Sequence, residues 1–224
     1  MTSLAKSVLT TGIAIEAALI IVGLALAPST MRSLVGVGEP VADFGLLLVI
    51  LAASKRGPFA IARLGPSAGT CLVIAVCFAV AYNALLLTDL LGHPIAVEAY
   101  WIFIAAAVLT SGIVAYQTRT IATGILAAAW SLVLGTILWS VGWMLIVYFS
   151  WGTKGQYAFW RRDGAIADYH HSGGGSLGVF LIRDVQGSLF FHPLLSIAIG
   201  LLCGAFGALI GTLAAGTRNR LRPA

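Results

Sequence analysis

The chain has 224 residues, of which 59% are hydrophobic and only 9% are charged, and its formal net charge is +5. Soluble domains carry about 25% charged residues, and a chain this short cannot bury so many apolar residues in one core. The composition therefore excludes an ordinary soluble protein and indicates that lipid surrounds most of the surface. The positive charge does not indicate nucleic-acid binding, because basic residues of membrane proteins gather in cytoplasmic loops.

Six apolar segments approach or exceed the length of about 20 residues that a helix needs to cross a bilayer. They lie at about residues 8–27, 40–53, 68–91, 97–116, 121–149 and 194–215. Their continuous runs of Leu and Ala favour helices over barrel strands, which alternate over about 10 residues. The expected fold is an all-α integral membrane protein, a six-helix transmembrane bundle in one domain of residues 1–224. The second segment is short, so its helix begins either at Pro40 or near Leu34 with a kink at the proline.

Residues 151–193 form the only long polar stretch, and we expect one extracytoplasmic loop there, between the fifth and sixth spans. Within it, Gly173 to Gly178 favours a flexible turn over a phosphate-binding loop. The apolar residues around Arg183 and Asp184 are compatible with a short β-hairpin or with an amphipathic segment on the membrane surface, and an interfacial element that covers the bundle is the favoured interpretation.

Charge bias predicts the orientation. An even number of spans places both termini on one side, and the loops and ends on that side hold eight Lys and Arg residues against one in the short loops opposite. The eight are Lys6, Lys55, Arg56, Arg63, Arg119, Arg218, Arg220 and Arg222, and the one is Arg32. Both termini are therefore expected in the cytoplasm, in a plasma (inner) membrane of bacterial type.

Glu16 lies in the middle of the first span, where a charge is costly. We expect a neutral, protonated carboxyl that faces the bundle interior. Asn83 is the first candidate for its hydrogen-bond partner and Ser131 the second; Tyr82 and Ser140 are further candidates. The acid has either a proton- or cation-relay role or only a packing role.

Histidine and acidic side chains concentrate in the loops and span ends on the side of the membrane opposite the termini, where they could bind zinc or copper. The candidate ligands are His93, His170, His171, His192, Asp168 and Asp184. Their spacing matches no metal motif, so solvated or interfacial histidines are the favoured interpretation. Nothing in the sequence requires a cofactor. A divalent metal ion is the only cofactor that its candidate ligands suggest.

Two further groups of side chains have both a structural and a functional interpretation. Salt bridges within the polar segment are favoured over anion binding for its arginines, and a packing stripe is favoured over a quinone or lipid groove for the tryptophans of the fifth span. The arginines are Arg161, Arg162 and Arg183, their expected partners are Asp163, Asp168 and Asp184, and the tryptophans are Trp139, Trp143 and Trp151.

The sixth span contains two small-xxx-small pairs, Gly200 with Gly204 and Gly207 with Gly211. Such pairs let helix backbones approach closely. We therefore expect this span inside the bundle, packed against another helix of the chain, a second copy or a membrane-protein partner.

Three classes of function are compatible with these features. A small transport or accessory subunit fits the buried acid, and this class ranks first. A membrane-embedded enzyme or metal-binding protein with its site under the outer loop is the first alternative, although no nucleophile–base motif supports catalysis. A structural or partner-binding membrane protein is the second alternative.

Overall fold

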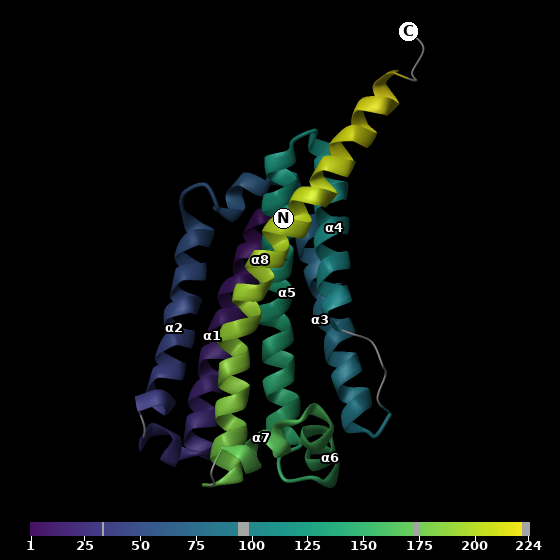
Figure 1. The fold of residues 1–224 in the computed structure, drawn as a ribbon. Helices are drawn as coiled ribbons and strands as arrows, with labels where there is room; N and C mark the ends of the chain where they lie inside the picture. The colour runs from purple at the N-terminus through teal and green to yellow at the C-terminus, as the bar shows by residue number, and fades with distance from the viewer. Residues whose placement is uncertain (33, 94–98, 173–174, 221–224) are drawn as a thin grey trace.

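The computed structural model describes residues 1–32, 34–93, 99–172 and 175–220 (Figure 1). Within these ranges the chain is helical and contains no β-strand. Its helices are α1 (Thr2–Leu26), α2 (Leu34–Lys55), α3 (Ala68–Leu90), α4 (Ala99–Thr118), α5 (Ile121–Phe149), α6 (Lys154–Asp163), α7 (Ala165–His171) and α8 (Leu177–Arg220), with the 3-10 segments Pro28–Arg32 and Ile61–Ser67.

Among the described residues, six helices are long and apolar enough to cross a membrane, namely α1, α2, α3, α4, α5 and α8. The expected all-α, six-span architecture is therefore confirmed. Helix α2 begins at Leu34 and contains Pro40, which agrees with the earlier of the two starts expected for the second span. Both termini lie at one end of the bundle, and α6 and α7 lie at the other, which we call the α6–α7 end (Figure 1).

The fifth span is the central helix. In its most apolar stretch 61% of the residues are buried, against 28–33% in the other five spanning helices. The sequence explains this position, because α5 is apolar or small on every side, and a helix of that kind is stable only when neighbours surround it. Helices α1, α3, α4 and α8 all pack against it.

The expected loop at residues 151–193 is not observed. Thr153 caps α6 by accepting a hydrogen bond from the backbone N–H of Gln156 at 3.2 Å, and Gly164, in the left-handed conformation, joins α6 to α7. The last part of the expected loop belongs to α8, and the β-hairpin considered around Arg183 is wrong. Of the expected glycine turn, Gly173 and Gly174 lie outside the described residues.

Helix α8 has 44 residues and includes Pro193 in its interior. At about 1.5 Å per residue it is about 66 Å long, roughly twice the hydrocarbon thickness. Its first half is helical because Leu181, Val185 and Leu189 recur at four-residue steps and are buried. Its C-terminal part projects beyond the other helices (Figure 1).

The glycines of α8 pack against helices of the same chain. A Cβ added at Gly200 would lie 2.6 Å from the Cα of Ala129 in α5, and Gly211 lies directly against Gly112 in α4. The opposite face of α8 is exposed, with Leu202 at 75% and Leu213 at 64%. The expectation of an interior sixth span thus holds for the glycine face and not for the whole helix.

Candidate functional site

Glu16 and Asp43 form a buried pair of carboxyl groups between α1 and α2. Glu16 is 1% exposed and Asp43 is 3% exposed, and the two groups are close enough to interact electrostatically. Oε2 of Glu16 and both carboxyl oxygens of Asp43 have no hydrogen-bond partner among the described residues. Neither residue belongs to the ion pairs formed in this part of the chain. The inward position of Glu16 agrees with expectation.

Asn83, Ser131 and Ser140 were expected as partners of Glu16, but the hydrogen bonds that they donate go to backbone carbonyl oxygens. The amide nitrogen of Asn83 donates to the carbonyl oxygen of Ala79 at 3.0 Å, and its amide oxygen has no partner among the described residues. Ser131 and Ser140 donate to backbone carbonyl oxygens of Cys71 and Thr136. The reason is the packing order: α3 packs chiefly against α5, whereas Glu16 faces the side of α1 where Asp43 is found.

The sequence did not identify Asp43 as a candidate site residue. The shorter of the two limits considered for the second span, residues 40–53, leaves Asp43 near the outer end of the span. The helix begins two turns earlier, so Asp43 lies well inside it. A usable signal was present. Asp43, Leu47, Ile50 and Ser54 recur at helical spacing, and all four are buried.

Asp43 is connected to the α6–α7 end through Glu39, one helical turn away. The carboxyl groups of Glu39 and Asp43 interact electrostatically. Glu39 accepts hydrogen bonds from Nε and Nη2 of Arg183 in α8, at 3.3 and 3.2 Å. Glu39 and Arg183 also line a cavity of about 620 Å³, together with Ser172, Gly175, Ser176, Val179, Phe180, Asp184, Gly187, Ser188 and Phe191. We call it the Glu39 cavity.

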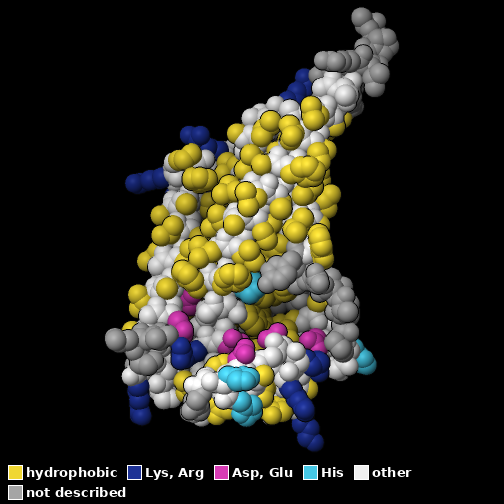
Figure 2. Space-filling model, in the orientation of Figure 1, with side chains coloured by type: hydrophobic (Ala, Val, Ile, Leu, Met, Phe, Trp, Pro, Cys, Tyr) yellow, Lys and Arg dark blue, Asp and Glu magenta, His cyan; other side chains and the backbone are white. Residues whose placement is uncertain are grey.

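A second cavity, of about 350 Å³, lies between α3, α5, α6 and α8, and we call it the acidic cavity. Its lining consists of Tyr82, Leu85, Leu86, Asp89, Trp139, Trp143, Phe159, Asp163, Asp184, Ser188 and His192. Figure 2 shows this end of the molecule hollowed, with acidic side chains and a histidine around the opening. Three carboxyl groups from three helices thus meet one space.

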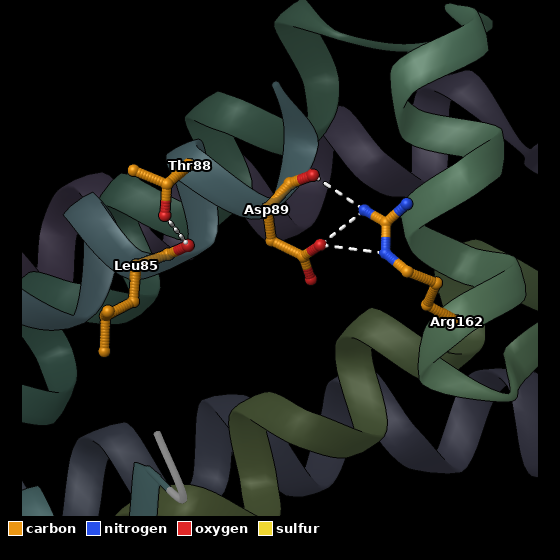
Figure 3. A network of polar contacts seen from close by, with 4 residues as sticks. All are labelled: Leu85, Thr88, Asp89 and Arg162. Carbon is orange, nitrogen blue, oxygen red and sulfur yellow. Dashed lines mark hydrogen bonds and ion pairs between the residues drawn. The ribbon is translucent and has the colours of Figure 1, made fainter. Parts of the chain in front are cut away.

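Arg162 connects α6 to the end of α3, beside the acidic cavity, through hydrogen bonds to Asp89. Nε of Arg162 donates to Oδ1 of Asp89 at 2.9 Å, and Nη2 donates to the backbone oxygen of Asp89 at 2.6 Å and also contacts Oδ1 (Figure 3). The expected salt bridges within the polar segment are therefore wrong for Arg162 and Arg183. These arginines pair with acids of α3 and α2, because the segment folds back onto the bundle.

Aromatic rings form the inner wall of the acidic cavity. Trp139 and Trp143 are stacked, with ring centroids 5.1 Å apart and an angle of 16°, and the ring of His192 lies 4.7 Å from that of Trp139. Nδ1 of His192 is 2.8 Å from the backbone oxygen of Ser188. Packing was the favoured interpretation of Trp139, Trp143 and Trp151. The first two are buried but also line the cavity, and Trp151 is partly buried and packs against the hydrophobic core.

The carboxyl group of Asp163 lies in an unfavourable electrostatic environment. Its pKa is raised from the ordinary value of 3.8, first by desolvation and then by the negative charges of Asp89 and Asp168. The residue as a whole is exposed, so water screens part of this effect. A cation placed in the acidic cavity would relieve the repulsion.

The candidate metal ligands do not assemble. His93, His170, His171 and Asp168 are exposed, whereas His192 and Asp184 line the acidic cavity. In the described ranges no three His, Cys, Asp or Glu side chains are placed to hold one metal ion. His192 and Asp184 are thus the two expected ligand residues that the fold brings to a common space.

Comparisons with protein-family models, with curated proteins and with solved structures find no match to this chain.

Proposed function

We propose that this multi-pass protein is a small transport protein, or the subunit of one, in which Glu16 and Asp43 hold and exchange a proton. The observation that carries the proposal is the burial of both groups, which interact electrostatically and have no basic partner among the described residues. Two carboxylates in a medium of low dielectric constant repel each other strongly, so the pair is stable when one proton is shared.

A route for that proton leads to the α6–α7 end. Asp43 is one turn from Glu39, and residues four apart on a helix are neighbours. Glu39 lines the Glu39 cavity, which we take as the entry to the route from that end. In the other direction the next buried residues of α1 are Ile13, Gly12, Leu9 and Ala5, all without polar side chains. These features support proton access to the pair from the α6–α7 end.

Proton entry into liposomes tests this function. Purified protein is reconstituted with a pH-sensitive dye inside, and a potassium diffusion potential drives protons inward. Wild-type protein should acidify the lumen faster than protein-free liposomes, and Glu16→Gln and Asp43→Asn should abolish the difference. Asp168→Asn, which removes an exposed carboxyl group on α7, should leave the flux unchanged.

Two outcomes would contradict the proposal. One is a wild-type flux equal to that of empty liposomes. The other is a Glu16→Gln variant that conducts protons as fast as the wild type, in a preparation that elutes as a single species and keeps its helical circular dichroism.

The chain's location and partners belong to the same proposal. We place it in a plasma (inner) membrane of bacterial type with both termini in the cytoplasm, on the charge bias of its loops. The glycine face of α8 is occupied by α4 and α5, so a second copy or another membrane protein would have to use the exposed face that contains Leu202, Phe206 and Leu213.

A further inference from the structure

We propose that the acidic cavity is a binding site for a small organic cation that carries an ammonium group. The inference rests on residues other than the Glu16–Asp43 pair, and binding at this site does not depend on proton transport.

The first observation is the charge of the lining. Of its three carboxyl groups, Asp89 is paired with Arg162, whereas Asp163 and Asp184 form no ion pair with a basic side chain within the described ranges. They come from α6 and α8, and they repel each other electrostatically. The fold therefore places carboxyl groups around one cavity, which a positively charged ligand complements.

The second observation is the aromatic wall. A cation is attracted to the face of a tryptophan or tyrosine ring within about 6 Å of its centroid. Trp139, Trp143 and Tyr82 line the same cavity as the carboxyl groups. A cavity lined by both carboxyl groups and aromatic rings suits an ammonium group, because its alkyl substituents can contact the rings while its charge interacts with the acids.

The third observation is an unpartnered donor in that wall. Trp139 is 4% exposed, and its indole N–H has no acceptor among the described residues. A buried donor without an acceptor is costly unless a ligand supplies one. The ligand class is thus narrowed to amines that also carry an oxygen acceptor, such as a hydroxyl or carbonyl group.

A single metal ion does not fit. In the part of the chain that the structure describes, no three candidate ligand side chains are close enough to share one ion. The volume of about 350 Å³ lies instead in the range of small-molecule pockets, which begins at about 300 Å³. The carboxyl groups are spread around a space that a molecule fills.

Calorimetric titration of the purified full-length protein in lipid nanodiscs tests the site. The probes are choline and ethanolamine, which represent the quaternary and primary forms of the class, with 3,3-dimethylbutanol as the neutral analogue of choline and zinc ion as the metal. At least one ammonium probe should bind saturably. Asp184→Asn and Asp163→Asn should each weaken binding about tenfold or more.

The control variants separate this site from the proton pair. Asp168→Asn and Glu16→Gln should bind the probe as the wild type does. Asp163 is exposed, so Asp163→Asn is expected to fold even if Asp184→Asn does not. The proposal would be overturned if neither ammonium probe bound saturably, if the neutral alcohol bound equally well, or if only zinc bound. It would also be overturned if folded Asp163→Asn protein bound the probe with unchanged affinity.

Discussion

Glu16 and Asp43 show how far single residues could be interpreted before the fold was known. The mid-span position of Glu16 indicated its burial, because a charge facing lipid is costly. Its partner could not be identified, since that depends on which helix packs beside α1. Asp43 was overlooked although it recurs with Leu47 and Ile50 on a buried stripe. The stripe can be seen whichever start is taken for the helix, but spacing alone does not show that Asp43 interacts with Glu16 on α1.

The acidic cavity was beyond sequence reasoning for a related reason. His192 and Asp184 were candidates because of their residue types. Asp89 and Asp163 line the same cavity but lie 74 positions apart in the chain, and the contact of Arg162 with Asp89 joins their helices. Contacts of that kind follow from tertiary packing, which spacing along the chain does not encode.

Asp163 gives a prediction at the scale of one residue. Its folded-state pKa is raised above 3.8, so its ionisation opposes folding as the pH rises through the raised pKa, and no such cost exists below 3.8. Asp163→Asn should therefore raise the melting temperature near neutral pH and leave it unchanged at lower pH. The rise should be small, because the residue is exposed. Asp89, Asp168, Asp184 and Arg162 are the charged neighbours that set its size.

Thermal unfolding followed by near-ultraviolet circular dichroism would check this, with Asp168→Asn as the matched exposed aspartate. A lower melting temperature for Asp163→Asn at neutral pH would show that the carboxyl group stabilises the fold.

At the scale of helices, the sequence predicted the six spans because length and apolar composition determine which segments a bilayer accepts. It did not predict that α8 starts at Leu177. The segment before Pro193 has a helical pattern of apolar residues, but charged and polar residues between them suggested a loop. Tertiary packing decides the matter, because Leu181, Val185 and Leu189 are buried within the bundle.

The glycines of α8 give a prediction at this scale. A Cβ at Gly204 would lie 2.8 Å from the Cβ of Ala128, whereas nothing lies within 4 Å of one at Gly187 on the same helix. Gly204→Leu should cost about 1–3 kcal/mol through overpacking, or somewhat more, and Gly187→Leu should cost little. Unfolding in mixed detergent micelles measures both. Equal stabilities of the two variants would show that close packing of α8 is dispensable.

Acidic side chains are unevenly distributed along the long axis of the molecule. The acidic and histidine side chains visible in Figure 2 gather at the α6–α7 end, where basic side chains also lie, and the described parts of the two termini lie at the opposite end. The parity of the spans explains why both termini share an end. The side that faces the cytoplasm remains a prediction from the charge bias.

Cysteine labelling in intact cells tests that orientation. In a chain whose three native cysteines are replaced by alanine, Lys154→Cys on α6 and Lys55→Cys at the end of α2 provide exposed positions at opposite ends. A membrane-impermeant maleimide should label the first from outside and the second only after permeabilisation. The reverse pattern would invert the orientation.

The most direct test of the central claim, a buried carboxyl pair that shares a proton, is the infrared spectrum of the protein in lipid at neutral pH. The wild type should show a C=O stretching band of a protonated carboxyl group. Glu16→Gln and Asp43→Asn should each remove or shift this band, because the proton belongs to both residues. Asp168→Asn should not change it. A wild-type spectrum without this band, or a band unaffected by both substitutions in the pair, would contradict the account.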